Sequence, residues 1–380
     1  MRSEGRVDVA FILPALWGGG VERVYLDLAE QFVRKGFGVD LVLAKAEGPM
    51  LGQVPSGVRV IDLKVPRRLR LVRTSWPLLH YFATVAPRVA IPVWGYLDYL
   101  PLWAAWKAGV PTLWVLHSTP DYFGDLPGMR RWFALRFAQR ALRESLLRSR
   151  ARVGAVSKGV AEAFGQLGGV KVEKIRVLPN PIDVGRIRLL AQEAIPSLPF
   201  EERSPYLVAV GRLHPEKGFD LLIEAFALLK RRLSEKTPYL LMLGEGPERL
   251  YLERLAKDLG VSERVLFLGW TSNPYPYVAR SLGLVVSSRY EGLPTVVLEA
   301  LALGVPVVAT EAPGGLLEAL DYGRMGILTP RTAEGLALGM EKLLVEGFVL
   351  EEAKVIRHLE RYSPDRAFGK YMEVIQELWA

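Results

Sequence analysis

The residues that decide the fold of this chain are YLVAVGRLHPEKG, positions 206–218. The apolar run Tyr206–Val210 predicts a buried strand, Gly211 opens a loop directly after it, and a helix is expected over 218–232. A strand that leads through a glycine loop into a helix is the repeating unit of a parallel sheet covered by helices.

The same order of elements recurs along the whole chain, together with helices at 21–35 and from about 247 to 259. Further strands are predicted at 7–13, 38–44, 58–63, 110–116, 151–156, 239–243, 265–268, 282–287 and 305–309. The fold class is therefore α/β, with two Rossmann-like β/α/β domains.

A chain of 380 residues is too long for one ordinary core, which also favours two domains. Pro179-Asn180-Pro181 interrupts the alternation, because prolines on both sides of Asn180 end any strand or helix. We predict an N-terminal domain over 1–178, a linker over 179–204 and a C-terminal domain over 205–360. A C-terminal helix over 361–380 is expected to pack back toward the N-terminal domain.

The composition excludes several classes of protein. There is no cysteine, which excludes disulfides, thiolate metal sites and a cysteine nucleophile. The apolar stretch 76–117 is interrupted by five prolines and several charges, so no segment is predicted to span a membrane. The first residues do not have the pattern of a signal peptide, and a cytoplasmic location is expected.

Charge is distributed unevenly. Residues 1–190 contain 28 Lys+Arg and 15 Asp+Glu, a net +13, whereas residues 191–380 contain 21 and 26, a net −5. Within the basic half, 128–152 carries eight arginines against one acid, Glu144, with aromatic residues interleaved. Such a helix is typical of an anionic membrane surface, so we expect peripheral contact through 128–152, at the inner face of the plasma membrane. The alternative is a helix that packs on the core and has a solvated basic face. A second basic cluster contains Arg67, Arg68, Arg70 and Arg73.

The loop 211–218 places two cations at the start of the predicted helix. The Arg212 guanidinium is a planar fork of donors that suits phosphate oxygens, and Lys217 adds a mobile point charge. The helix amino terminus adds N–H donors and positive potential. The loop therefore predicts a phosphate site, although its spacing alone fits ordinary surface cations equally well.

The segment 291–299 has the same character. Pro294 suits the first turn of a helix that runs to Leu303 and ends at Gly304. Glu299 lies among apolar residues, where a buried carboxylate needs a partner. Ligand hydroxyls would supply that partner, and a structural ion pair with an arginine is the alternative.

Two features of the first half follow predicted strands. Gly18-Gly19-Gly20 fits close approach of the backbone to a phosphate, but also a plain tight turn. It does not match Gly-x-Gly-x-x-Gly, because Arg23 takes the place of the last glycine, which argues against a nicotinamide dehydrogenase. His117 follows a strand whose carboxyl end would line a crevice, although a single histidine is also often structural.

Taken together, these motifs resemble the retaining glycosyltransferases of family four, over about residues 7–330. Those enzymes have the GT-B fold, in which two Rossmann-like domains face each other across a central cleft. The resemblance is carried by Gly-Arg212-x4-Lys217-Gly, Glu291-x7-Glu299, Gly244-Glu245-Gly246, Gly269-Trp270, Asn180-Pro181-Ile182-Asp183 and the Gly19-Gly20 loop. The segment 287–294 is especially similar to the family signature.

The resemblance implies a metal-independent hexosyltransferase without a cofactor. A nucleotide diphosphate sugar, with a UDP-sugar favoured, would be the co-substrate, and a glycan or lipid-linked molecule the acceptor. The implied catalytic residues are His117, Arg212, Lys217 and Glu291. Arg212 and Lys217 would neutralise the diphosphate, and Glu299 would hold the ribose hydroxyls. The remaining donor contacts would be Gly19, Gly20, Gly244, Gly246, Gly269, Trp270, Gly292, Leu293, Pro294 and Thr295.

Two other functions fit the same motifs. A nucleotide-sugar 2-epimerase of the same fold would share the diphosphate site, and a non-catalytic protein could keep the site for binding alone. No nucleic-acid recognition motif is present, and no nucleic-acid partner is expected.

Overall fold

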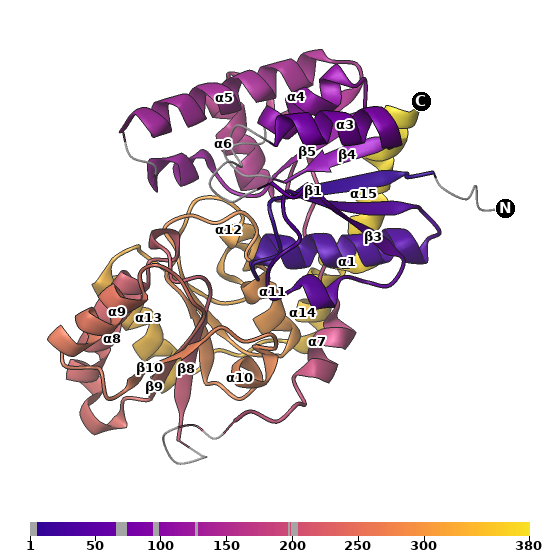
Figure 1. Ribbon diagram of the computed structural model, residues 1–380. Helices are drawn as coiled ribbons and strands as arrows, with labels where there is room; N and C mark the ends of the chain where they lie inside the picture. Colours follow the sequence, from indigo (N-terminus) through magenta and orange to yellow (C-terminus); the bar gives the residue numbers. More distant parts are fainter. Residues whose placement is uncertain (1–5, 66–73, 94–98, 126–127, 197, 199–203) are drawn as a thin grey trace. The chain divides into compact units, whose positions relative to one another are not determined.

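The computed structural model describes residues 6–65, 74–93, 99–125, 128–196, 198 and 204–380. The chain divides into two compact units (Figure 1). Unit 1 contains Met1–Pro181 and Pro364–Ala380, and unit 2 contains Ile182–Ser363. Each unit has its own parallel sheet with helices packed on it.

Unit 1 is built on a seven-stranded sheet in the order β3-β2-β1-β4-β5-β6-β7. Its strands are β1 (Val9–Leu13), β2 (Val39–Leu43), β3 (Val58–Asp62), β4 (Val89–Pro92), β5 (Thr112–Leu116), β6 (Ala151–Ala155) and β7 (Ile175–Val177). β1, β2 and β5 are buried along their whole length, as expected for continuous apolar runs in a parallel sheet. β4 and β7 were not predicted, because runs of four and three residues give little periodic signal.

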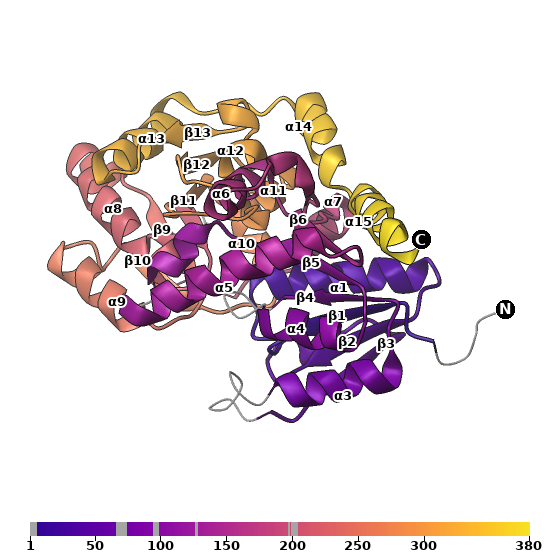
Figure 2. The ribbon, with the colours of Figure 1, turned by 90° about the horizontal axis from the view of Figure 1, so that it is seen from above.

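The helices of unit 1 include one from the end of the chain. They are α1 (Gly20–Arg34), α3 (Ser75–Val85), α4 (Tyr99–Lys107), α5 (Gly128–Leu147), α6 (Lys158–Gly168) and α15 (Pro364–Trp379). α15 lies beside α1 (Figures 1 and 2), where the Phe368 and Phe32 rings are 4.9 Å apart. Glu377 of α15 pairs with Arg152 and Arg176, at 2.9 and 2.7 Å. The last helix is thus held to unit 1 by apolar and charged contacts.

The apolar stretch 76–117 supplies several elements of unit 1, namely most of α3, then β4, α4 and β5. Among the residues that the structure describes, no helix has the length and hydrophobicity that crossing a bilayer requires.

Unit 2 contains a six-stranded sheet in the order β10-β9-β8-β11-β12-β13. The strands are β8 (Tyr206–Val210), β9 (Tyr239–Leu243), β10 (Val265–Gly269), β11 (Gly283–Val286), β12 (Val307–Thr310) and β13 (Ile327–Thr329). The helices are α7 (Val184–Leu190), α8 (Phe219–Leu233), α9 (Arg249–Asp258), α10 (Tyr275–Ala279), α11 (Thr295–Ala302), α12 (Leu316–Ala319), α13 (Ala333–Glu346) and α14 (Glu352–Leu359). Phe226 of α8 and Met340 of α13 are fully buried in the core of this unit.

The stretch 179–204 differs from the irregular linker that the sequence suggests, because it contains α7. Asp183 caps this helix by accepting a hydrogen bond from the Arg186 N–H at 2.9 Å. The Asn273 amide donates to Leu190 O at 2.9 Å, within unit 2. An aspartate cap and tertiary contacts, rather than a long periodic pattern, support this short helix.

The strand order determines where a ligand site can form. Counted from β8, the order in unit 2 is 3-2-1-4-5-6, and the first six strands of unit 1 follow the same order. In such sheets the loops after strands 1 and 4 diverge and leave a crevice at the carboxyl ends of the strands. In unit 2 this position lies between β8 and β11.

Candidate active site

The loops after three neighbouring strands of unit 2 are bonded to one another. Gly211 N donates to Leu243 O at 2.9 Å, Leu213 N donates to Glu245 O at 3.0 Å, and Gly244 N donates to Gly269 O at 2.8 Å. These backbone bonds bring the segments 211–213, 244–246 and 269–270 together at one edge of the sheet.

Two of the predicted donor-binding glycines are required by this backbone packing. A Cβ on Gly244 would lie 1.8 Å from Gly211 O, and a Cβ on Gly246 would lie 2.2 Å from Leu213 O. Only glycine lets the two loops approach so closely. Their place next to Arg212 agrees with the predicted site, but a contact with a ligand is not needed to explain them.

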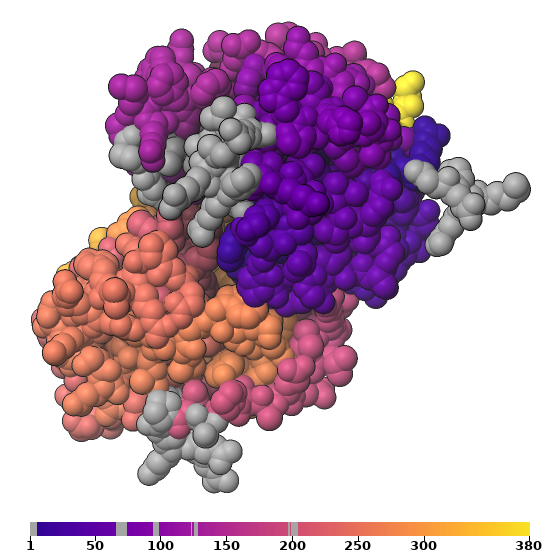
Figure 3. All heavy atoms as spheres, viewed as in Figure 1, coloured from indigo at the N-terminus to yellow at the C-terminus, as the bar shows by residue number. Residues whose placement is uncertain are grey.

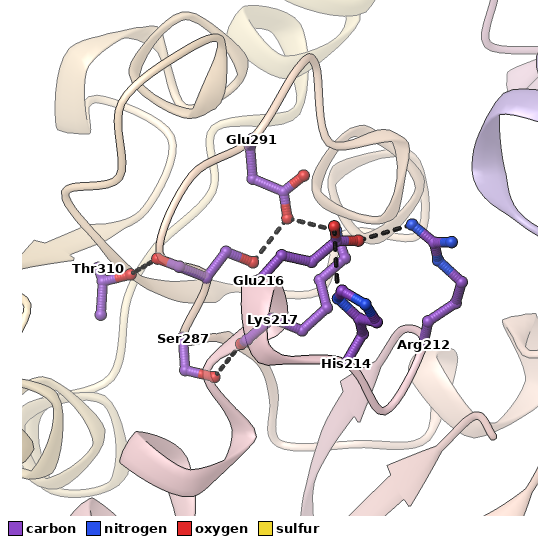
Figure 4. Close-up of polar contacts among 8 residues, drawn as sticks. Arg212, His214, Glu216, Lys217, Ser287, Glu291 and Thr310 are labelled. Carbon is purple, nitrogen blue, oxygen red and sulfur yellow. Dashed lines mark hydrogen bonds and ion pairs between the residues drawn. The ribbon is translucent and has the colours of Figure 1, made fainter. Parts of the chain in front are cut away.

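The turn that carries Lys217 is locked to the segment after β11 (Figure 4). Pro215 opens a 3-10 turn, and Gly218, with φ 60°, ends it and leads into α8. A Cβ on Gly218 would lie 2.3 Å from Ser287 O. Ser287 Oγ donates to Lys217 O at 2.9 Å, and Arg289 N donates to Glu216 O at 2.8 Å. These contacts join the loop after β8 to the segment after β11.

Lys217 and Glu291, predicted to act on one ligand, are in direct contact. Lys217 Nζ lies 2.7 Å from Glu291 Oε1, which also accepts a hydrogen bond from Ser288 Oγ at 2.6 Å. Glu291 is only 7% exposed. A carboxylate that is buried to this degree needs such partners.

A second ion pair lies beside the first. Arg212 Nη2 is 2.7 Å from Glu216 Oε1, and His214 Nδ1 is 3.7 Å from Glu216 Oε2. Glu216 is buried, whereas 61% of the Arg212 side chain is exposed. The buried carboxylate can therefore orient a guanidinium that remains open to an anion.

The α11 amino terminus is the third feature of the site. Pro294 (φ −71°, ψ 101°) precedes the helix as an extended residue, which corrects its expected place in the first turn. As the residue before the helix, Pro294 makes no side-chain cap hydrogen bond. The amino-terminal end of a helix carries positive potential from its unpaired backbone N–H groups. Glu299 is buried inside α11, as the pattern around it suggested, and the turn after α11 is closed by Gly304 with φ 72°.

The remaining predicted residues of unit 2 lie on the same segments. Gly292 and Leu293 are buried between Glu291 and α11, and Thr295 is the first residue of that helix. Trp270 follows β10 with a half-exposed side chain. The structure thus gathers into one unit Arg212, Lys217, Gly244, Gly246, Gly269, Trp270, Glu291, Gly292, Leu293, Pro294, Thr295 and Glu299.

Gly19, Gly20 and His117 form a separate group in unit 1. Gly18 has φ 98°, Gly19 precedes α1, and Gly20 is already its first residue, so the glycine loop is shorter than predicted. His117 follows β5, and its Nε2 lies 2.7 Å from the Tyr25 hydroxyl of α1. Burial lowers the pKa of His117 to about 3, so the imidazole is neutral at pH 7.

Sequence reasoning missed the partners that hold these groups, namely Glu216, Ser288 and Tyr25. Glu216 could have been predicted as a partner, because it is an acidic residue directly before Lys217 in a loop that also contains Arg212. Tyr25 gave no such signal, because it is 92 positions from His117. Within the described residues, no three His, Asp or Glu side chains are grouped so that they could hold a metal ion.

The α5 helix exposes its large apolar residues. Ala134, Ala138 and Ala141 are buried on one face. Met129, Trp132, Phe133 and Phe137 are exposed. At 100° per residue Met129 and Trp132 lie on roughly the opposite face, Phe133 lies to the side, and Phe137 lies nearer the alanines and stacks on Tyr99. Figure 3 shows this magenta region at the surface of unit 1. The cluster Arg67, Arg68, Arg70 and Arg73 lies outside the described residues.

Two family models match the chain in succession. Residues 18–186 match Glycosyltransferase Family 4, and residues 191–358 match Glycosyl transferases group 1. The lipopolysaccharide core biosynthesis glycosyltransferase LpsE of Rhizobium meliloti is 37% identical over 189 residues, which are 50% of this chain and 52% of LpsE.

A second relative is the N-acetylgalactosamine-N,N'-diacetylbacillosaminyl-diphospho-undecaprenol 4-alpha-N-acetylgalactosaminyltransferase of Campylobacter jejuni. It is 32% identical over 197 residues, which are 52% of this chain and 51% of that enzyme. The matches therefore span about half the length of these two relatives.

Solved structures match over nearly the whole chain. Anabaena HepE in complex with UDP and glucose has a TM-score of 0.76 at 21% identity, covering 98% of this chain and 100% of HepE. WaaG, a glycosyltransferase involved in lipopolysaccharide biosynthesis, has a TM-score of 0.74 at 18% identity, covering 97% of this chain and 99% of WaaG. These likenesses show a shared fold.

Proposed function

Since the chain belongs to the group 1 glycosyltransferases of family 4 and has their GT-B fold, we propose which reaction it catalyses. It transfers a hexose or N-acetylhexosamine from a nucleotide diphosphate sugar, with a UDP-sugar favoured. The acceptor is a glycan or a lipid-linked molecule of cell-surface polysaccharide or glycolipid synthesis. The observation that carries this proposal is the position of Arg212 and Lys217 in the loop after β8, where the strand order of unit 2 leaves a crevice between β8 and β11.

In this proposal the donor diphosphate lies against Arg212 and Lys217. The exposed fork of Arg212 bonds two phosphate oxygens while Glu216 keeps the guanidinium in place. Lys217, 2.7 Å from Glu291, adds a second positive charge, and the α11 amino terminus adds a third source of positive potential. Three fixed sources of positive charge would take the place of a divalent metal, so the enzyme is proposed to be metal-independent.

The chemistry follows from this placement of charge. The bond from sugar C1 to the diphosphate oxygen breaks, and the leaving group keeps the electron pair. The cations stabilise this charge where it develops. The acceptor hydroxyl oxygen bonds to C1 on the same face, and its proton passes to the departing phosphate, so the anomeric configuration is retained.

The carboxylates and the remaining residues would orient the donor. Glu299 holds the ribose hydroxyls, and Glu291 contacts the transferred sugar with the backbone of Gly292 and Leu293. The backbone around Gly269 and Trp270 meets the base. From unit 1, Gly19 and Gly20 approach the donor, and His117 contacts the sugar on the acceptor side.

Binding and turnover of the donor test this proposal. Calorimetric titration with UDP, GDP and ADP is expected to show one site, with UDP the tightest ligand. The preferred sugar nucleotides are then incubated with lipid-linked acceptors, and products are identified by mass spectrometry. No transfer to any acceptor, together with tight UDP binding, would favour the non-catalytic reading.

An incubation without acceptor separates the transferase from an epimerase. The transferase leaves the sugar nucleotide unchanged or hydrolyses it slowly. A 2-epimerase converts it to its epimer in the absence of any acceptor, and that product would overturn the proposal.

We also propose that α5 contacts an anionic membrane surface, where a lipid-linked acceptor would be found. Trp132 and Phe133 are exposed on a helix whose buried residues are mostly small, with Leu142 as the one large apolar side chain among them, which a helix made only for core packing would not favour. Among the described residues, no carboxylate pairs with Arg130, Arg131 or Arg136, so their charge is available to acidic headgroups.

Flotation with lipid vesicles tests the membrane contact. Binding is expected to vesicles that contain phosphatidylglycerol and not to pure phosphatidylcholine. The triple change R130Q, R131Q and R136Q should weaken it roughly a hundredfold, at about 1 kcal/mol per arginine. Changing Leu250 and Tyr251, exposed on α9 of unit 2, to Ser is the matched control and should have no effect. Equal and negligible binding to both kinds of vesicle would reject the contact.

A further inference from the structure

The Tyr25–His117 pair is a part-buried polar contact that the proposed reaction does not by itself require. Tyr25 is fully buried in α1, and its hydroxyl lies 2.7 Å from His117 Nε2 at the end of β5. The two rings meet edge to face, with centroids 5.2 Å apart. On its other side the Tyr25 ring packs edge to face against Phe11 of β1, at 5.2 Å. The tyrosine therefore has little freedom to turn its hydroxyl away from the imidazole.

The imidazole is neutral, because burial lowers the pKa of His117 to about 3. A neutral imidazole carries its hydrogen on one ring nitrogen and accepts at the other. The partner of Nε2 therefore decides which nitrogen keeps the hydrogen. The Tyr25 hydroxyl can either donate to Nε2 or accept from it.

A third buried group favours donation by Tyr25. The Tyr371 hydroxyl, on α15, is fully buried and has no hydrogen bond of good geometry. Among the described residues, the side-chain group that interacts with the Tyr371 hydroxyl is the hydroxyl of Tyr25. Burial raises the pKa of Tyr371, and the interaction with Tyr25 opposes this rise. If Tyr25 accepted a hydrogen from Nε2 and donated its own to Tyr371, the Tyr371 hydrogen would lack a buried acceptor, which is costly. If Tyr371 donates toward Tyr25 and Tyr25 donates to Nε2, both hydroxyl hydrogens have an acceptor.

The second ring nitrogen remains available. Nδ1 of His117 has no hydrogen-bond partner among the described residues, and the side chain is partly exposed. A hydrogen on Nδ1 would make this edge of the ring a donor, suited to an oxygen that accepts.

We propose that Tyr25 is a positioning residue for His117: its hydroxyl donates to Nε2 and fixes the neutral tautomer that carries its hydrogen on Nδ1. His117 then meets a ligand as a neutral Nδ1–H donor. That the ligand is the sugar of the donor rests on the proposed function, whereas the tautomer itself does not.

Nuclear magnetic resonance of the full chain labelled with ¹⁵N-histidine tests the tautomer directly. The chain has only four histidines, and H117Q identifies the signal of His117. At pH 7 the long-range ¹⁵N–¹H pattern of His117 is expected to be that of the Nδ1–H tautomer. In Y25F, which keeps the ring contacts and loses the hydroxyl, the pattern should move toward the Nε2–H form. An Nε2–H pattern in the unchanged protein, or no change in Y25F, would overturn the proposal.

Two control variants separate positioning from stability. Y371F keeps the contact between Tyr25 and His117 and removes the Tyr371 oxygen as an acceptor for the Tyr25 hydroxyl. Tyr25 should therefore still donate to Nε2, and the Nδ1–H tautomer should persist. Y81F removes a buried hydroxyl elsewhere in unit 1, one that donates to Asp40 Oδ2 at 2.7 Å. Y81F should leave the tautomer and the turnover unchanged, even where it lowers stability. If Y81F shifted the His117 tautomer as much as Y25F does, the effect would be structural and the proposal would fail.

The transferase assay gives an independent readout. Y25F should lower kcat about tenfold, the loss expected for one misdirected hydrogen bond, with little change in the KM for the donor. The H117Q, Y25F double variant should be no worse than H117Q alone, since Tyr25 acts through His117. If no transfer is detected with any acceptor, the proposed function fails, while the tautomer measurement still tests the role of Tyr25.

Discussion

The two units share one strand order but differ in what they place at the carboxyl ends of their strands. Unit 2 gathers two ion pairs, Lys217–Glu291 and Arg212–Glu216, and the amino terminus of α11. Unit 1 offers the backbone of Gly19 and Gly20 and a neutral pair, Tyr25 and His117. The net charges of the sequence halves have the opposite distribution, +13 for residues 1–190 and −5 for residues 191–380. Five arginines of the first half lie on α5.

On the proposed function, net charge does not locate the anion site. The acidic half carries the proposed diphosphate site, because a few cations held by buried carboxylates matter more than the sum of surface charges. The basic half instead presents a neutral strand end. On the proposed function, the charged groups of unit 2 would supply electrostatic stabilisation.

The largest effect is expected from Lys217→Ala. Loss of one fixed cation at the leaving group should lower turnover about 10²–10³-fold. Steady-state rates are compared with those of Lys257→Ala, an exposed lysine of α9, which should match the unchanged protein. Thermal unfolding is recorded in parallel, because Glu291 loses its cation. Full turnover in a well-folded Lys217→Ala variant would contradict the proposed role of unit 2 in stabilising the leaving group.

Arg212→Ala should weaken UDP binding next most strongly. Hydrogen bonds to a charged group contribute about 1.5–3 kcal/mol, so the Kd should rise at least tenfold. Arg212→Lys should recover only part of the affinity, because lysine keeps the charge but lacks the fork. Titration calorimetry measures both, with Arg324→Ala, whose side chain is 77% exposed, as control. Equal UDP affinity in the Arg212→Ala variant and the unchanged protein would place the diphosphate elsewhere.

Gly246→Ala tests whether the glycines of unit 2 serve packing or the ligand. The added Cβ meets Leu213 O, so we expect a loss of about 1–3 kcal/mol in the free energy of unfolding. The control is Gly369→Ala in α15, where a Cβ has no atom within 4 Å, and it should be neutral or stabilising. Chemical denaturation gives both values. Unchanged stability combined with lost UDP binding would show that Gly246 serves the ligand instead.

The smallest effect on stability is expected from His117→Gln, and that effect should appear only in acid. The folded pKa of His117, about 3, lies below the value of about 6.5 of an unfolded histidine. Between these values the unfolded chain binds the proton, so stability falls as pH falls, by at most about 1.4 kcal/mol per pH unit. The unchanged protein should therefore lose more stability between pH 7 and pH 5 than the variant does. Urea unfolding of both, with His80→Gln at an exposed site as control, measures the difference; parallel losses would mean that His117 titrates normally.

Much of the fold was predictable from local pattern. Tyr206–Val210 and Tyr239–Leu243 were placed without error, because continuous apolar runs between glycine or proline residues are unambiguous strands. β4 and β7 were missed, since short strands depend on neighbours for their stability. α7 was missed because a proline-rich stretch conceals a helix supported by tertiary contacts.

The sequence names candidate residues for the site but not the contacts among them. Arg212, Lys217, Glu291 and Glu299 stand out because their motifs together resemble one family, whereas each motif alone also fits a structural role. Their pairing could not be inferred, since Lys217 and Glu291 are 74 positions apart. Nor could the reason for Gly244 and Gly246, which lies in the backbone of another loop.

The sequence by itself determined the alternation of strands and helices and the kinds of chemical group at the strand ends, because both depend on residue type and short-range spacing. Tertiary structure alone decided which carboxylate holds which cation, and that Tyr25 lies against His117. Hydrogen bonds and ion pairs depend on distances of a few ångströms between segments far apart in the chain, and only the packed sheets fix those distances.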